Sequence, residues 1–172
     1  SNLQLTAGTV SAWIRGTDTV NLQGIFVKQY AYGMFVKTGT LQGFEWSGNT
    51  WTDSGVTVAD GTWHHVLYTF SAALNSKKVY VDGVLKATGT MAINSNTIAA
   101  TIGAVDPSSC TVQFFNGSLD DVRVYNRVLT QSEITSLYKL GQSTFQKSQN
   151  AKATTGLVGL WSFDGADVDF SA

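Results

Sequence analysis

The stretch KVYVDGVLKA, residues 78–87, predicts a β-hairpin and, with it, the class of fold. Asp82-Gly83 supplies the two positive φ angles that a two-residue hairpin turn requires, and Val and Leu continue on both sides of it. A turn of this kind joins adjacent antiparallel strands. Residues 78–87 are therefore expected to lie in an antiparallel sheet.

Strand-like runs recur on both sides of this hairpin, between turn signals. The chain has 17 glycines, one proline and 12% aromatic residues, a composition that favours strands and tight turns over helices. The runs cover residues 9–15, 24–30, 33–38, 43–48, 63–70, 77–89, 96–104, 118–126 and 156–163. This spacing predicts an all-β sandwich or barrel, and 172 residues suffice for one domain with a sizeable core.

One segment, LTQSEITSLYKLG (129–141), predicts a short helix near residues 130–140. Thr130 is expected to cap it, with Glu133 reaching back three residues later and Leu129 packing against the first turn. Gly141 is a suitable C-terminal stop. The apolar positions that share one helical face are Ile134, Leu137 and Tyr138.

The C-terminal part of the chain consists of a polar segment followed by an apolar one. Residues 142–155 carry one large apolar side chain and no periodicity, so they are expected to form an exposed linker. The apolar pattern then resumes in GLVGLWSF, residues 156–163, which resembles the opening strand of a domain.

Charge and cysteine usage exclude several classes of protein. The net charge is -1, and the basic pair Lys77-Lys78 is too small a cluster to attract a nucleic acid backbone. No apolar run approaches the roughly 18 residues that cross a bilayer, so no membrane insertion is expected. The single cysteine, Cys110, cannot form an internal disulfide and is expected to be a small apolar or loop residue.

Three stretches together resemble a known family: TWHHVLYTF (62–70), KKVYVDGVLKATG (77–89) and FFNGSLDDVRVYNRVLTQSEITSLY (114–138). They are similar to laminin-G-like domains of the concanavalin A-like lectin/glucanase superfamily, particularly the bacterial extracellular type. The resemblance extends over about residues 3–141. It implies a two-sheet antiparallel jelly-roll sandwich, often with a structural calcium ion, and roles in glycan binding or adhesion as repeated extracellular or cell-surface modules.

The resemblance also suggests a domain organisation. Such domains begin with a strand like GLVGLWSFDG, but here the TVSAW strand (9–13) comes almost at once. We therefore expect residues 1–141 to be a sandwich that lacks its usual first strand, and residues 156–172 to be the first-strand-like segment of a following repeat. An unpaired sheet edge recruits an available strand. Residues 156–164 are expected to complete the sandwich, within their own chain or in a strand-exchanged oligomer of neighbouring repeats.

A catalytic function is not expected. Glycoside hydrolysis needs two carboxyl groups that flank the sugar bond, and related glucanases present theirs in an E-x-D-x-E pattern. The chain has two glutamates: Glu133 is explained by the helix cap, and Glu45 has no acidic neighbour two or four positions away. A glycoside hydrolase is therefore the weakest of the functions considered.

The adjacent histidines His64 and His65 are expected to be structural. Neighbouring strand residues point to opposite faces, so the two imidazoles do not readily chelate one ion. One of them is expected to pack beside Trp63.

The acidic pair Asp120-Asp121 allows two interpretations. Strand alternation places Asp120 with Val122 on a core-facing row and Asp121 with Arg123 on the other face. In the first interpretation Asp120 accepts backbone or Trp N–H groups and Asp121 pairs with Arg123. In the second, which the resemblance implies, the pair binds a structural calcium ion (Ca2+). Its further ligands would be two oxygen-bearing side chains, those of Asn116 and Asp164.

A carbohydrate site needs aromatic faces for sugar C–H stacking and a few hydrogen-bonding side chains. Residues 28–55 offer both, and Trp51 is expected to be the most exposed ring because polar residues flank it. The candidate ligand-binding residues are Tyr30, Tyr32, Glu45, Trp46, Asn49, Trp51 and Asp53. Half of these rings are expected to face the core by strand alternation alone.

Two functions remain after these exclusions. The first is a non-catalytic module of a multi-repeat surface or secreted protein that binds a glycan or an extracellular protein. The second is a structural spacer or assembly module joined by strand complementation.

Overall fold

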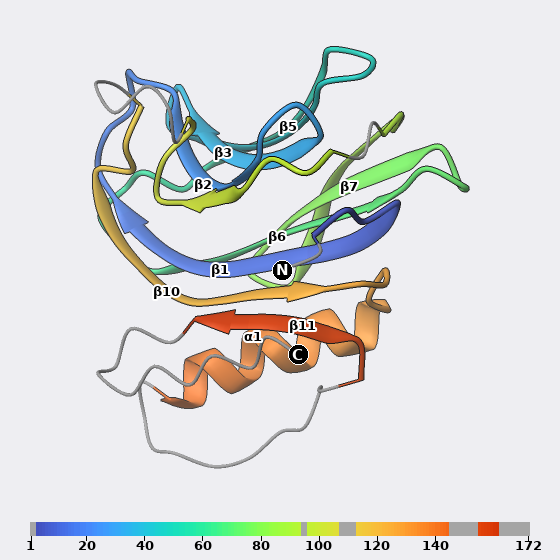
Figure 1. Ribbon diagram of the computed structural model, residues 1–172. Helices are drawn as coiled ribbons and strands as arrows, with labels where there is room; N and C mark the ends of the chain where they lie inside the picture. The colour runs from blue at the N-terminus through green and yellow to red at the C-terminus, as the bar shows by residue number, and fades with distance from the viewer. Residues whose placement is uncertain (1–2, 94–95, 107–112, 145–154, 162–172) are drawn as a thin grey trace.

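The computed structural model describes residues 3–93, 96–106, 113–144 and 155–161 as two antiparallel sheets and one helix. The sheets face each other as the layers of a sandwich (Figure 1), which confirms the predicted all-β class. The six-stranded sheet runs in the order β11(Leu157–Trp161), β10(Gly117–Tyr125), β1(Ala7–Gly16), β6(His64–Ser71), β7(Ser76–Val81) and β8(Val84–Gly89). The five-stranded sheet runs in the order β5(Thr50–Thr57), β4(Thr40–Glu45), β3(Tyr32–Lys37), β2(Gln23–Lys28) and β9(Ala100–Ile102).

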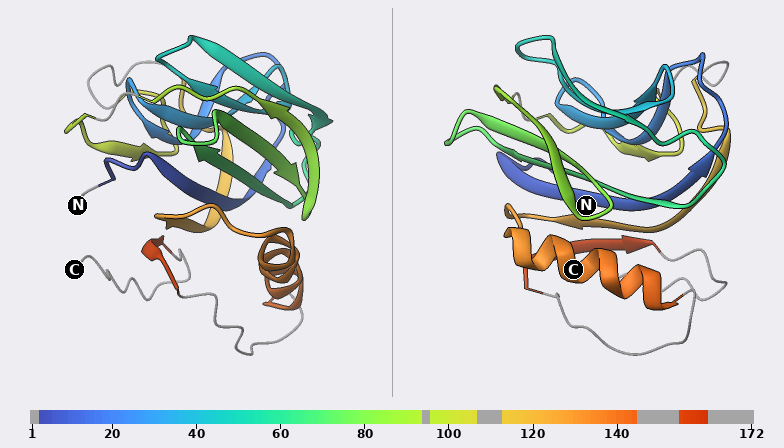
Figure 2. Two further views of the ribbon diagram at one scale, coloured as in Figure 1. Left: turned by 90° about the vertical axis from the view of Figure 1, so that its right-hand side faces the viewer. Right: turned by 180° about the vertical axis from the view of Figure 1, so that it is seen from behind.

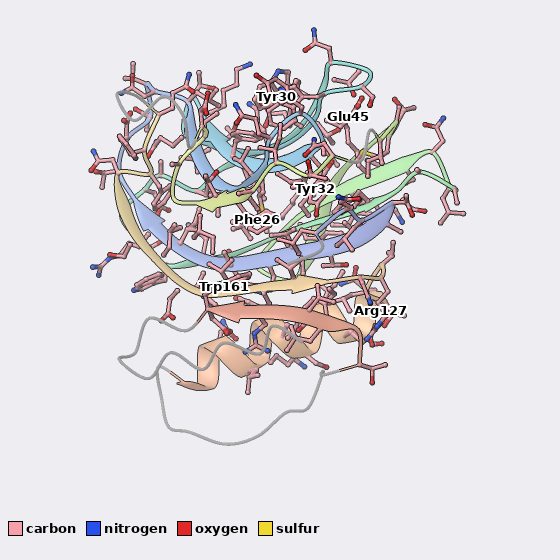
Figure 3. All side chains as sticks on the ribbon, in the orientation of Figure 1. Phe26, Tyr30, Tyr32, Glu45, Arg127 and Trp161 are labelled. Carbon is pink, nitrogen blue, oxygen red and sulfur yellow. The ribbon has the colours of Figure 1, made fainter. Side chains whose placement is uncertain are left out.

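The main hydrophobic core lies between the two sheets. Alternate residues of β1 point into it, and Val10, Ala12 and Ile14 have no more than traces of exposed surface. The five-stranded sheet contributes Phe26 and Tyr32 to this core (Figure 3). Across the core, the Tyr32 ring contacts that of Phe70 on β6, with 4.1 Å between the ring centroids.

The hairpin at Asp82-Gly83 is confirmed. Asp82 has a φ of 52° and Gly83 a φ of 76°, as a two-residue turn between β7 and β8 requires. The side chain of Asp82 has a second role, because its Oδ1 accepts the backbone N–H of His65 at 3.0 Å. The turn is therefore anchored to the neighbouring strand β6.

The helix α1(Gln131–Thr144) lies against the outer face of the six-stranded sheet (Figure 2). Its predicted start is confirmed: Glu133 Oε2 accepts the Thr130 N–H at 2.8 Å, and the Glu133 N–H donates to Thr130 Oγ1 at 3.4 Å. Leu129 and Ile134 pack together in a second apolar cluster beneath it.

The predicted end of the helix is wrong. Gly141 does not stop α1, which continues to Thr144, so the first three residues of the predicted linker are helical. Gly141 instead provides clearance: a Cβ atom at this position would lie 2.0 Å from Nε1 of Trp13 on β1. Glycine is needed at this position because helix and sheet approach closely, and not because the backbone changes direction.

The segment 155–161 pairs with the six-stranded sheet of its own chain. β11 runs antiparallel to β10, and the backbone N–H of Asn126 donates to Gly156 O at 2.9 Å. Val158 and Trp161 pack against the main core. The origin of this segment as the start of a following repeat stays a prediction, and residues 145–154 and 162–172 lie outside the described ones.

Within the described residues, α1 is the helix present, and it is too short and too polar to cross a membrane.

Candidate functional site: an aromatic face on the five-stranded sheet

The outer face of the five-stranded sheet carries a cluster of aromatic side chains. On β3, Met34 and Val36 point into the main core, so Phe35 between them points outward. Neighbouring strands and the turn after β4 bring further rings to this surface. We call it the aromatic face and define it by Phe35, Phe44, Trp46 and Trp51.

The rings of the aromatic face hold one another in place. Trp51 lies 4.4 Å from Phe44 and 5.3 Å from Phe35, measured between ring centroids, and Trp46 lies 4.8 Å from Phe44. The two phenylalanines are buried, whereas both indoles are half-buried. The phenylalanines thus form the floor on which two partly exposed tryptophans rest.

Ordered polar groups lie beside Trp51. Lys37 places its Nζ 4.3 Å from the centre of the Trp51 ring, a cation–π contact. Gln42 donates from Nε2 to Asp53 Oδ2 at 3.0 Å, and Asp53 Oδ1 accepts the Gly55 N–H at 2.8 Å. An ammonium group, an amide and a carboxylate therefore lie next to a partly exposed indole.

Two turns at one end of the sheet bring further candidates to this region. Tyr30 has a φ of 58° and 56% of its surface exposed, and its ring lies 6.4 Å from Trp46. Asn49 is exposed and has a φ of 51°, which asparagine tolerates better than most residues. Tyr30, and not Trp51 as predicted, is the most exposed of the candidate rings.

Two predicted ligand-binding residues face the interior instead. Tyr32 is 1% exposed, and its hydroxyl donates to Leu3 O at 3.1 Å between the sheets. Glu45 is also 1% exposed: its carboxylate accepts the Gly48 N–H at 2.7 Å and the Thr50 hydroxyl at 2.8 Å. Both side chains are structural, because strand alternation turns them away from the aromatic face.

Sequence reasoning missed four residues of this region. They are Phe35, Phe44, Lys37 and Gln42, which were not among the candidates. The pairing of β4 with β5 places Phe44 opposite Trp51 and Gln42 opposite Asp53. Cross-strand pairs share a face, so the register of this one hairpin would have identified both partners.

The acidic pair on β10 does not lie as alternation predicted. Asp121 has a φ of 49° at a bulge, which shifts the register by one residue. Asp120 consequently lies opposite Trp13 in the strand register. It is therefore on the face of the sheet that the helix covers, and not on the core-facing row. The hydrogen bonds expected in the first interpretation are present: Asp120 Oδ1 accepts the Asp121 N–H at 2.7 Å, and Asp121 accepts two 2.8 Å bonds from Arg123.

The calcium interpretation gains no support from the described residues. Among them, no group of three or more Asp, Glu, His or Cys side chains is arranged to hold a metal ion. Arg123 already neutralises Asp121, and Asn116 is exposed. Asp164 and Cys110 lie outside the described residues, so calcium binding stays a prediction.

The adjacent histidines have opposite environments, as predicted from alternation. His64 lies between two carboxylates, with Nδ1 2.9 Å from Asp82 Oδ2 and Nε2 3.3 Å from Asp60, and the hydrogen bond to Asp82 raises its pKa. His65 is buried, which lowers its pKa to about 4. It packs on Trp13, its cross-strand partner, with 5.4 Å between the ring centroids. The packing of one histidine beside Trp63 stays a prediction.

The comparison with protein families decides the classification. The laminin-G-like family model described as "Concanavalin A-like lectin/glucanases superfamily" matches residues 1–135. The chain belongs to this superfamily. A search of curated proteins found no match. The resemblance to laminin-G-like domains is thereby confirmed, and the fold of this superfamily member is a two-sheet sandwich consistent with a jelly roll.

Solved structures share this fold at low sequence identity. A protein from Bacteroides ovatus, to which carbohydrate binding has been attributed, matches with a TM-score of 0.75 and 16% identity over 96% of this chain and 47% of its own. The CBM40 of an IT-sialidase from Ruminococcus gnavus, bound to alpha2,3 sialyllactose, matches with a TM-score of 0.62 and 15% identity over 80% of this chain and 90% of its own. Domain 4 of an extracellular arabinanase from Geobacillus stearothermophilus, in complex with arabinotriose, matches with a TM-score of 0.55 and 20% identity over 77% of this chain and 66% of its own.

This superfamily member spans about half the length of the Bacteroides ovatus protein.

Proposed function

We propose that the chain is a non-catalytic carbohydrate-binding module whose ligand binds to the aromatic face. The observation that supports this proposal is the pair of half-buried indoles, Trp46 and Trp51, held on a floor of phenylalanine rings. Sugar rings stack their C–H groups on such surfaces, and Lys37 and Asp53 lie beside Trp51 to hydrogen-bond hydroxyl groups.

Two further observations favour binding over hydrolysis. Both glutamates of the chain are engaged in structural hydrogen bonds, Glu45 within a turn and Glu133 at the start of the helix. Solved structures with the same fold include modules in complex with sialyllactose and arabinotriose. By analogy with them, we place the module in a secreted or cell-surface protein, where it binds glycans or glycosylated partners.

The test is a screen of soluble glycans against the full chain, followed by titration calorimetry of the best ligand. Trp51→Ala should weaken binding at least tenfold, because it removes a stacking surface and the partner of Lys37. Trp63→Ala is the matched control, since this indole lies away from the aromatic face and contacts Arg15. Equal affinities for the Trp51→Ala variant and the unchanged chain would refute the proposed site.

A second candidate function, assembly by strand complementation, rests on β11. Among the described strands it pairs with β10 alone, and the 2.8 Å bond from Arg127 Nε to Thr155 O is a further attachment of this segment. A short edge strand with few attachments to its sheet is readily exchanged between molecules. Light scattering across a concentration series should then show dimers that disappear in a chain ending at Thr144. A full chain that is monomeric at every concentration would contradict exchange.

A further inference from the structure

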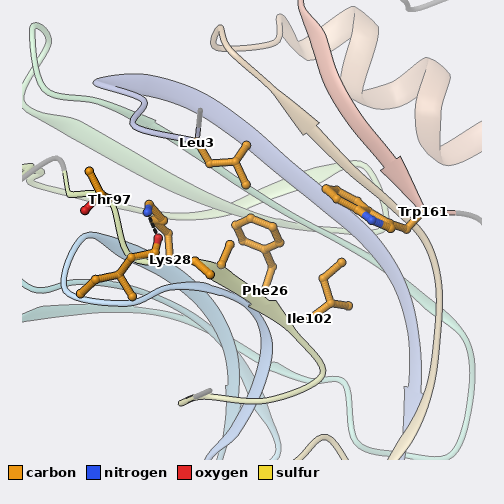
Figure 4. Close-up of a pocket in the computed structure, with 9 residues that line it drawn as sticks. Leu3, Phe26, Lys28, Thr97, Ile102 and Trp161 are labelled. Carbon is orange, nitrogen blue, oxygen red and sulfur yellow. Dashed lines mark hydrogen bonds between the residues drawn. The ribbon is translucent and has the colours of Figure 1, made fainter. Parts of the chain in front are cut away.

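A cavity of about 400 Å³ lies between the two sheets at their open edge, where β9 and β11 are the outermost strands. In Figure 4, Lys28 and Trp161 lie on opposite sides of Phe26, with Leu3 and Ile102 around the same hollow. Seven of the nine lining residues are apolar. The cavity is separate from the aromatic face, because Phe26 points into the core whereas the aromatic face lies on the other side of the five-stranded sheet.

Lys28 is the charged residue among those that line the cavity. Alternation on β2 turns Phe26 and Lys28 inward and Val27 outward, so the lysine enters the space between the sheets. Only 3% of its surface is exposed, and its ammonium group donates to Ile98 O. Within the described part of the chain, no carboxylate forms an ion pair with it.

A buried ammonium group without a counter-charge is unfavourable. Burial lowers the pKa of Lys28, which reflects the loss of hydration by the charged form. An ammonium carries three donors, and a carboxylate in the cavity would supply both a counter-charge and strong hydrogen bonds. The volume of the cavity falls in the range of about 300–1,000 Å³ in which small-molecule sites occur.

We propose that this cavity binds a small carboxylate with an apolar body, such as a medium-chain fatty acid. The carboxylate pairs with the ammonium group of Lys28, and the apolar body lies along Phe26, Ile102 and Trp161. Apart from those of Lys28 and Thr97, the side chains that line the cavity are apolar, which favours a ligand with an apolar body over a sugar. The site is thus distinct in place and in chemistry from the proposed carbohydrate site.

Calorimetric titration of the full chain with sodium octanoate and, separately, with 1-octanol tests the assignment. Octanoate should bind saturably and at least tenfold more tightly than octanol. Lys28→Met should lower the affinity for octanoate at least tenfold, whereas Lys86→Met, at an exposed position on β8, should leave it unchanged. Absence of saturable octanoate binding, or equal affinity in the Lys28→Met variant, would overturn the proposal.

A second readout needs no substitution at Lys28. In a ¹⁵N-labelled full chain, octanoate should shift the indole N–H resonance of Trp161, identified from the Trp161→Phe spectrum. The resonance of Trp51, on the aromatic face, should stay in place. An unmoved Trp161 resonance at saturation would refute the site even if the Lys28→Met variant failed to fold.

Discussion

Replacing Gly141 by alanine should destabilise the domain, although the same change stabilises most helices. In a helix interior, alanine is favoured over glycine by about 0.8–1.0 kcal/mol. At this position, however, the new Cβ would lie 2.0, 2.3 and 2.4 Å from three atoms of the Trp13 indole. Carbon atoms in contact prefer separations of about 3.5–4.0 Å, so helix or indole has to move.

The indole of Trp13 has little freedom to move. It is 5% exposed, stacks on Tyr138 at 5.9 Å and contacts His65 at 5.4 Å. Overpacking in such a site costs about 1–3 kcal/mol, and three simultaneous clashes place the cost in the upper part of that range. After the gain in helix propensity is subtracted, Gly141→Ala should lower the free energy of unfolding by about 1–2 kcal/mol. This corresponds to a decrease in Tm of about 2–8 °C.

Urea unfolding followed by far-ultraviolet circular dichroism measures this difference. Ser136→Ala is the control, because it changes an exposed position of the same helix and should alter stability by less than about 0.5 kcal/mol. In a Trp13→Phe background, the penalty for Gly141→Ala should shrink, since the smaller ring leaves room. A Gly141→Ala variant as stable as the unchanged chain would refute the close packing of helix on sheet.

Two further predictions concern titratable groups. The raised pKa of His64 stabilises the fold fully below about pH 6.5, the pKa of this imidazole in the unfolded chain. This stabilisation is lost as pH rises through the pKa in the folded state. His65 acts in the opposite sense: its pKa of about 4 gives stability that is lost as pH falls from about 6.5 through 4. Unfolding free energies measured from pH 4 to 8 should therefore peak near 6.5, and His64→Gln should remove the decline at higher pH; an unchanged profile would contradict this. Glu133→Ala should cost about 0.5–2 kcal/mol, and Glu133→Gln less, because an amide oxygen still accepts the Thr130 N–H. If urea unfolding shows that both variants lose the same stability, the hydrogen bond from the Thr130 N–H does not contribute as proposed.

Local signals allowed parts of the fold to be predicted from the sequence. The Asp82-Gly83 turn and the Thr130–Glu133 capping box each depend on contacts within a few residues, so their geometry follows from the residues themselves. The end of the helix depends instead on Trp13, which is distant in the sequence. Local reasoning therefore interpreted Gly141 as a stop when it is a point of close approach.

The candidate site was predictable only in part, for a related reason. The run YGMFVK (32–37) is apolar at almost every position, because side chains on both faces of the strand are packed. The inward ones lie in the main core, and Phe35 lies beneath the tryptophans of the aromatic face. A strand buried on both faces loses the alternation that distinguishes inside from outside. Tyr32 was therefore included wrongly and Phe35 was missed. On β10, the bulge at Asp121 changed the phase of an otherwise clear alternation.

The most direct test of the central claim is the indole region of the ¹⁵N–¹H spectrum of the full chain during a glycan titration. The ligand is the best one from the glycan screen, and single tryptophan substitutions identify each resonance. If the aromatic face binds carbohydrate, the indole resonances of Trp46 and Trp51 should shift saturably, and that of Trp13, buried beneath the helix, should not. Saturable glycan binding that leaves the resonances of Trp46 and Trp51 unmoved would contradict the account.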